Sequence, residues 1–148
     1  MTNNNSIKKI TETGDMKVKL STLWIFVIFN YLYCDVLTNM DPVVLNKLIT
    51  GHVGSLQITQ GFLLGAAILM EIPIAMVILS RVLKYRASRW ANIIAGTIMT
   101  AVQILSMFVG TPTLYYIFFS TIEIVCTSLI VWYAWNWPKP GDILNNKI

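Results

Sequence analysis

The feature that most constrains this chain is an apolar run from Gly61 to Leu79 that carries a carboxylic acid, Glu71, at its middle. An α-helix rises about 1.5 Å per residue, so about 20 apolar residues span the roughly 30 Å hydrocarbon core of a bilayer. Three further runs have the same character, and none of the four contains Lys or Arg. The pattern predicts a helical membrane protein that holds a polar group in its interior.

Composition supports this class. Of the 148 residues, 55% are hydrophobic and 12% are charged, whereas a soluble domain carries about 25% charged residues. The cations fall between the apolar runs and form no basic face, so we expect a lipid bilayer as partner and no nucleic acid. Cys34 and Cys126 form neither a Cys-x-x-Cys pair nor a disulfide framework.

The apolar runs and the polar segments between them predict an all-α fold, a transmembrane four-helix bundle. We expect a membrane domain over residues 20–137. It follows a polar cytoplasmic segment, residues 1–19, that buries nothing, and it precedes a cytoplasmic tail, residues 138–148. The four helices are expected at about 20–37, 56–79, 90–109 and 113–135.

Between the first two helices, residues 38–55 are too polar to span a bilayer. Asp41 suits a helix N-cap, Pro42 suits the first helical position and Gly51 suits the helix end. We therefore expect a short interfacial helix in this outer loop. It is either a connector or a lid over an opening.

The cations also predict the orientation. With the N-terminus and the C-terminus both in the cytoplasm, only Lys47 among the 11 Lys and Arg residues lies outside. Because cytoplasmic loops of membrane proteins are enriched in Lys and Arg, this arrangement is the favoured one.

Polar residues of all four helices fall at a similar depth, counted along each helix from its inner end: Asn30, Glu71, Gln103 and Glu123. Helical spacing of three and four residues extends this layer along three faces. These faces are Tyr116, Ser120, Glu123 and Thr127; Asn92, Gly96, Met99, Gln103 and Ser106; and Gln60, Leu64, Ala67 and Glu71. We predict a bundle whose interior seam is polar.

Glu71 and Glu123 are the principal candidate site residues. A carboxyl group in hydrocarbon without a nearby cation must be protonated, share a proton or hold a bound cation. One hypothesis is that this layer binds or translocates a small solute or a proton, in a homo-oligomer because four short helices enclose little volume. The alternative is a structural or accessory subunit whose buried carboxyls only stabilise the bundle.

Other local features are compatible with both hypotheses. Pro73 removes one backbone hydrogen bond and predicts a helix kink, which either shapes packing or opens a pocket. Gly61, Gly65 and Gly96 predict close helix packing, within the bundle or between two copies. His52 has no companion ligands, so we expect no metal site. No catalytic motif, phosphate-binding loop or cofactor motif is present, and an enzyme is the third choice.

Four sequence strings resemble a family of small uncharacterised bacterial four-helix membrane proteins. They are Tyr33-Cys34-Asp35-Val36-Leu37, Met70-Glu71-Ile72-Pro73-Ile74-Ala75-Met76 with Leu79-Ser80-Arg81, Arg89-Trp90-Ala91-Asn92-Ile93, and Phe108-Val109-Gly110-Thr111-Pro112-Thr113-Leu114-Tyr115-Tyr116. The resemblance covers about residues 20–137 and implies the four-helix fold and a bacterial inner-membrane location, without an assigned activity. In architecture alone, the chain is also similar to the DoxX-like proteins.

Overall fold

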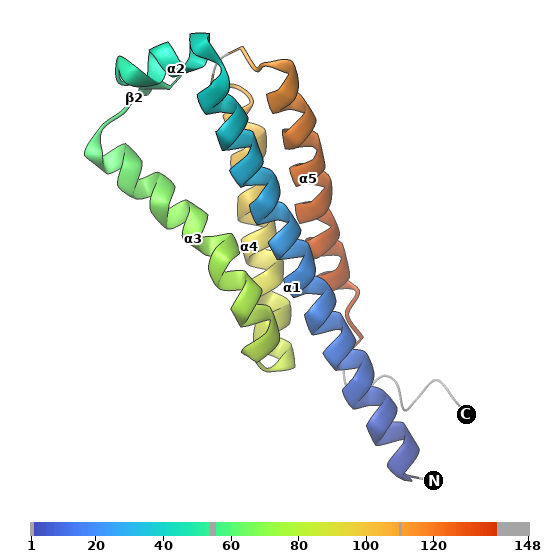
Figure 1. Cartoon of the computed structure of the whole chain (residues 1–148). Coiled ribbons are helices and arrows are strands. Elements are labelled where there is room, and N and C mark those ends of the chain that lie inside the picture. The colour runs from blue at the N-terminus through green and yellow to red at the C-terminus, as the bar shows by residue number, and fades with distance from the viewer. Residues whose placement is uncertain (1, 54–55, 110, 139–148) are drawn as a thin grey trace.

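The computed structural model describes residues 2–53, 56–109 and 111–138, with side chains from Thr11 onward. Within these residues the elements are α1 (Thr2–Met40), α2 (Pro42–Ile49), β1 (His52–Val53), β2 (Leu56–Gln57), α3 (Gln60–Val82), α4 (Tyr85–Ser106) and α5 (Leu114–Trp135). Figure 1 shows α1, α4 and α5 side by side, with α3 close to them at one end and diverging at the other. Except for Pro138, the expected tail lies outside the described residues.

The first long helix begins much earlier than the sequence indicates. It starts at Thr2 rather than at about residue 20, and Met16 packs against the hydrophobic core. Lys17 Nζ donates to the carbonyl oxygens of Leu83 at 2.6 Å and of Arg81 at 3.2 Å. A cation at the C-terminal end of a helix satisfies free carbonyl groups and complements the helix dipole. Part of the segment that was expected to bury nothing therefore fastens α1 to the end of α3.

The short helix after α1 is confirmed, together with its cap. The Asp41 side chain accepts hydrogen bonds from the backbone N–H of Val43 at 2.9 Å and of Val44 at 3.4 Å. Pro42 occupies the first turn, and Gly51 beyond the helix has a φ of 82°. This positive φ favours glycine, which explains why the helix ends there.

A small antiparallel hairpin follows and was not predicted. His52 pairs with Gln57, and Val53 pairs with Leu56. Residues 56 and 57 are therefore extended, and α3 begins later than expected, at Gln60. Thr59 caps this helix, because its hydroxyl accepts the backbone N–H of Phe62 at 3.1 Å.

Helix α4 is shifted toward the N-terminus relative to the predicted range 90–109. It begins at Tyr85 and ends at Ser106, so the basic segment is largely helical. Arg89 donates to the carbonyl oxygens of Ala134 at 3.1 Å and Trp135 at 2.8 Å. These bonds satisfy the end of α5, whose bounds lie close to the predicted range of 113–135.

At the end where α3 joins the bundle, a hydrogen-bonded group connects three helices. Trp24 Nε1 of α1 donates to Asn92 Oδ1 of α4 at 2.8 Å, and Ser80 Oγ of α3 donates to the same oxygen at 3.1 Å. Asn92 Nδ2 donates to the Ser88 carbonyl at 2.8 Å. Trp24, Ser80, Ser88 and Asn92 are all 0% exposed. We call this region, with the neighbouring Ile130 of α5, the packed half.

Gly96 allows α4 to approach α5 closely. A Cβ atom built on Gly96 would lie 2.7 Å from Val131 Cγ2 and 3.3 Å from the Thr127 carbonyl oxygen. The packing role predicted for Gly96 therefore has a clear steric cause. Gly65 has no such neighbour within 4 Å, and Gly61 has only its own cap, Thr59 Oγ1, at 3.8 Å. Among the described residues, neither lies at a close contact between helices.

The opposite region contains the first half of α3 and the parts of α1, α4 and α5 beyond the packed half, including Tyr31, Gln103 and Glu123. We call it the divergent half. The buried residues of α3 are Pro73, Met76 and Ser80, so its side chains from Gln60 to Ile72 are exposed or half-buried. In Figure 1 this part of α3 runs away from α1 and α4.

Among the described residues, three helical segments are long and apolar enough to cross a membrane. They are Thr11–Met40, Gln60–Val82 and Leu114–Trp135. Helix α4 also has 22 residues, but several of its buried residues are polar, including Asn92 and Gln103, and this lowers its average hydropathy. Its exposed side chains include Ile94, Ile98 and Leu105.

Candidate functional site

Helices α4 and α5 are joined by a series of polar side-chain pairs. Their hydroxyl and amide groups form three hydrogen bonds between the helices: Thr100 Oγ1 to Thr127 Oγ1 at 2.7 Å, Gln103 Nε2 to Ser120 Oγ at 2.8 Å, and Ser106 Oγ with Tyr116 Oη at 2.6 Å. The polar faces predicted for these two helices therefore do face each other. In an apolar environment, bonds of this kind hold helices together.

Glu123 lies on the same face of α5 and differs from its neighbours. It is one turn from Ser120 and one turn from Thr127, and its side chain is 1% exposed. Within the described part of the chain, neither carboxyl oxygen has a hydrogen-bond partner. A buried polar group without a partner is costly, and a charged one more so. The α4–α5 contacts thus pair the polar side chains one turn before and one turn after Glu123, and they leave its carboxyl group without a hydrogen bond.

Helix α1 places a second unpaired group near this carboxyl. Tyr31 is 7% exposed, and its buried hydroxyl has no hydrogen-bond partner. The Tyr31 and Glu123 side chains lie within electrostatic range of each other, and so do Glu123 and two further residues of α1, Cys34 and Asp35. The site therefore combines acidic and hydroxyl groups from α1 and α5.

Sequence reasoning named neither Tyr31 nor Asp35 as a site residue. The spacing of Trp24, Val27, Tyr31 and Cys34 follows steps of three and four residues, and all four are buried. This periodicity is the signal that identifies the inner face of α1. Asn30, which was predicted, is 8% exposed but donates to the Phe26 carbonyl of its own helix at 2.8 Å.

The face predicted for α3 does not join the site. Gln60 and Glu71 are exposed, as are Leu64 and Ala67 between them. The first half of α3 diverges from α1 and α4, so equal depth along the helices does not bring Glu71 into the interior. Glu123 is buried in the bundle and Glu71 is not.

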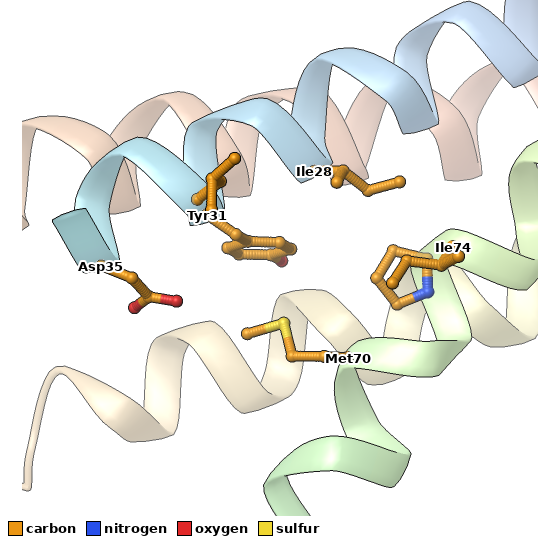
Figure 2. Close-up of a pocket in the computed structure, with 7 residues that line it drawn as sticks. Ile28, Tyr31, Asp35, Met70 and Ile74 are labelled. Atoms are coloured by element: carbon orange, nitrogen blue, oxygen red, sulfur yellow. The ribbon is translucent and has the colours of Figure 1, made fainter.

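A cavity of about 190 Å³ lies between α1 and α3 where the two helices separate. Figure 2 shows side chains of both helices pointing into this space, with Tyr31 extending from α1 toward α3 and Asp35 one turn further along. The lining residues are Ile28, Tyr31, Leu32, Asp35, Met70, Pro73 and Ile74. Pro73 has no N–H group, so the Leu69 carbonyl one turn earlier lacks its usual helical donor.

The described part of the chain has no group of three or more His, Cys, Asp or Glu side chains placed to hold a metal ion. Cys34 and Cys126 are both buried free thiols. The chemistry available at the site is therefore carboxyl, phenol, thiol, hydroxyl and amide chemistry.

Fold and site together define a helical protein with helices apolar enough to cross a membrane and a buried, unpaired carboxyl group between them. The chain belongs to a family of unknown function, DUF6326, whose family model matches residues 7–143. This confirms the resemblance to an uncharacterised family and extends it beyond residues 20–137. No curated protein and no solved structure matches the chain. The architectural likeness to DoxX-like proteins stays a prediction.

Proposed function

We propose that this chain is a multi-pass protein of the bacterial inner membrane in which α1, α3, α4 and α5 all cross the bilayer. The exposed apolar side chains of α4 support its inclusion with the three more hydrophobic helices, and its polar residues Ser88, Asn92 and Gln103 lie inside the bundle. A cytoplasmic position for the packed half is supported by the cations that belong to it: Lys17, Lys19, Arg81, Lys84, Arg86 and Arg89. Lys47 belongs to α2 at the opposite end.

The function that the geometry supports best is the binding or translocation of a small solute or a proton at Glu123. One observation carries this proposal: Glu123 is 1% exposed, and both of its carboxyl oxygens lack a hydrogen-bond partner. Ionisable groups inside a membrane are costly, and they commonly mark ion, proton or substrate pathways. Ser120, Gln103, Thr127 and Tyr116 form the polar surroundings of the carboxyl group.

The second candidate is a structural or accessory subunit whose polar layer only stabilises the bundle. The three α4–α5 side-chain pairs support it, because they join the helices and are satisfied. The carboxyl group of Glu123 does not fit this structural role, because a polar group needs a hydrogen-bond partner to stabilise the bundle. The exposed Gly61 and Gly65 on α3 leave room for a homo-oligomer or a partner helix in either case.

Labelling with an apolar carbodiimide tests the proposal. The reagent attacks protonated carboxyl groups that it can reach from the membrane or from a cavity. The full-length protein in lipid vesicles is treated across a range of pH and read by peptide mass spectrometry. Glu71 is the matched internal control, because it lies at a similar depth but is exposed, and Glu123→Gln is the control for assignment.

We expect labelling of Glu123 that falls as the pH is raised, and loss of this signal in Glu123→Gln. A solute or cation that occupies the site will protect Glu123 and leave Glu71 unchanged. If Glu71 is labelled while the Glu123 peptide is detected and unmodified at every pH, the carboxyl group is sealed inside the bundle and the proposal is wrong.

A further inference from the structure

We propose that the cavity between α1 and α3 binds a small organic ammonium ion, with its apolar group between the two helices and its positive charge beside Asp35. This inference names a substrate class for the proposed function. It rests on that function in so far as the charge of Glu123 acts on a ligand in the cavity. Three features of the site carry it: the size and lining of the cavity, its charge, and the position of Tyr31.

The size and lining fit a compact apolar group. The cavity is lined by the apolar side chains of Ile28 and Leu32 from α1 and of Met70 and Ile74 from α3. Its volume is about 190 Å³, and it is open on one side, since Leu32 and Ile74 are 54% and 46% exposed. By volume it can hold a group of benzene size, because an enclosed apolar cavity of about 150 Å³ binds benzene. A group of benzene size with a short attached chain therefore fits between the helices.

The charge of the site selects a cation. Asp35 lines the cavity, and Glu123 lies within electrostatic range of Asp35. No Lys or Arg occurs in α1 after Lys19, in α3 before Arg81 or anywhere in α5. Asp35 attracts a positive ligand and repels an anion when it is ionised, and an ionised Glu123 would add to this effect.

Tyr31 lines the cavity and offers two interactions to an ammonium ion. Its ring extends into the space between α1 and α3, as Figure 2 shows, and aromatic faces attract organic cations. Its hydroxyl is buried and unpartnered, and it lies within electrostatic range of Glu123. An ammonium ion in the cavity would thus lie beside the Asp35 carboxyl group and against the Tyr31 ring.

Benzylamine is a suitable probe, because it is charged at neutral pH and its apolar part has the required size. Benzyl alcohol is the matched neutral ligand and benzoate the matched anion. Equilibrium binding of each labelled ligand is measured to the full-length protein in lipid nanodiscs, with empty nanodiscs subtracted. We expect saturable binding of benzylamine that is at least about tenfold tighter than binding of either analogue.

Two variants test the location. Asp35→Asn keeps the shape of the side chain and removes its charge, and we expect it to weaken benzylamine binding by about tenfold or more. Ile74→Trp fills the cavity and keeps its charge, and it should also abolish binding. The matched control is Ile78→Trp, one turn away on α3 at a side chain that is 64% exposed and outside the cavity lining, which should bind like the wild type.

Equal binding of benzylamine and benzyl alcohol, or wild-type binding by both Asp35→Asn and Ile74→Trp, would overturn the inference. The first result would mean that the cavity holds neutral apolar molecules such as lipid chains. This failure is distinguishable from failure of the proposed function. If carbodiimide labels Glu123 but benzylamine does not bind, only the ammonium site is wrong. If benzylamine binds and needs Asp35 while Glu123 is never labelled, only the role proposed for Glu123 is wrong.

Discussion

The two halves of this molecule differ in how completely their buried polar groups are paired. In the packed half, Asn92 bonds simultaneously to α1 and α3, and Trp24 and Ser80 both use its oxygen. In the divergent half, Tyr31 and Glu123 are also buried, yet the Tyr31 hydroxyl and both Glu123 oxygens have no hydrogen-bond partner among the described residues. Satisfied polar groups stabilise a fold, whereas unsatisfied ones destabilise it and are retained where function requires them. We therefore expect stability to depend mainly on the packed half, and the ligand chemistry proposed above lies in the divergent half.

The largest expected effect is on the packed half. Asn92→Ala removes the partner of Trp24 and Ser80, leaving buried donors unsatisfied. We expect the free energy of unfolding to fall by about 3 kcal/mol, measured by reversible denaturation in mixed micelles. The matched control is Asn136→Ala, because Asn136 is exposed and donates only to the Trp132 carbonyl of its own helix. Equal effects of the two substitutions would mean that the packed half does not dominate stability.

The two halves should also differ in their tolerance of an added methyl group. Gly96→Ala forces a contact with Val131, and we expect a loss of about 1 to 3 kcal/mol of unfolding free energy. Gly65→Ala meets no atom within 4 Å, so it should be neutral or stabilise by up to about 1 kcal/mol through helix propensity. The same denaturation assay measures both. If Gly65→Ala instead shifts the protein to a smaller species in size-exclusion chromatography with light scattering, α3 packs against a second copy.

A smaller effect is expected for the pairs between α4 and α5. Ser120→Ala leaves Gln103 Nε2 without its partner, and we expect a loss of about 1 kcal/mol of unfolding free energy. Thr121→Ala, one residue away, is the control, because Thr121 is exposed and bonds only to the Ile117 carbonyl of its own helix. A loss for Thr121→Ala as large as that for Ser120→Ala would contradict a structural role for the interhelical pair.

The polar faces of α4 and α5 could be predicted because a polar residue in an apolar helix turns toward another polar residue. Asn92, Gln103, Ser120, Glu123 and Thr127 were therefore assigned to the interior, and all five are buried. The Asp41 cap of α2 could also be predicted, because capping depends only on residues that are close in the sequence.

The buried face of helix α3 could not be predicted in this way. Its exposed first half carries Gln60 and Glu71, although both were assigned to the interior. The helix is apolar on nearly every side, so its sequence contains little information about which side packs. Its orientation depends instead on the packing of Met76 and Ser80 in the other half. The group opposite Glu123 is Tyr31 of α1, which depth counting did not identify.

The measurement that tests the account most directly is the unfolding free energy of Glu123→Leu compared with the wild type. Because the carboxyl group is buried and unpartnered, replacing it with an apolar side chain of similar size should stabilise the fold by about 1 to 3 kcal/mol and abolish carbodiimide labelling and ligand protection at this position. A comparable loss of stability would contradict the account, because it would show that the carboxyl group holds the bundle together.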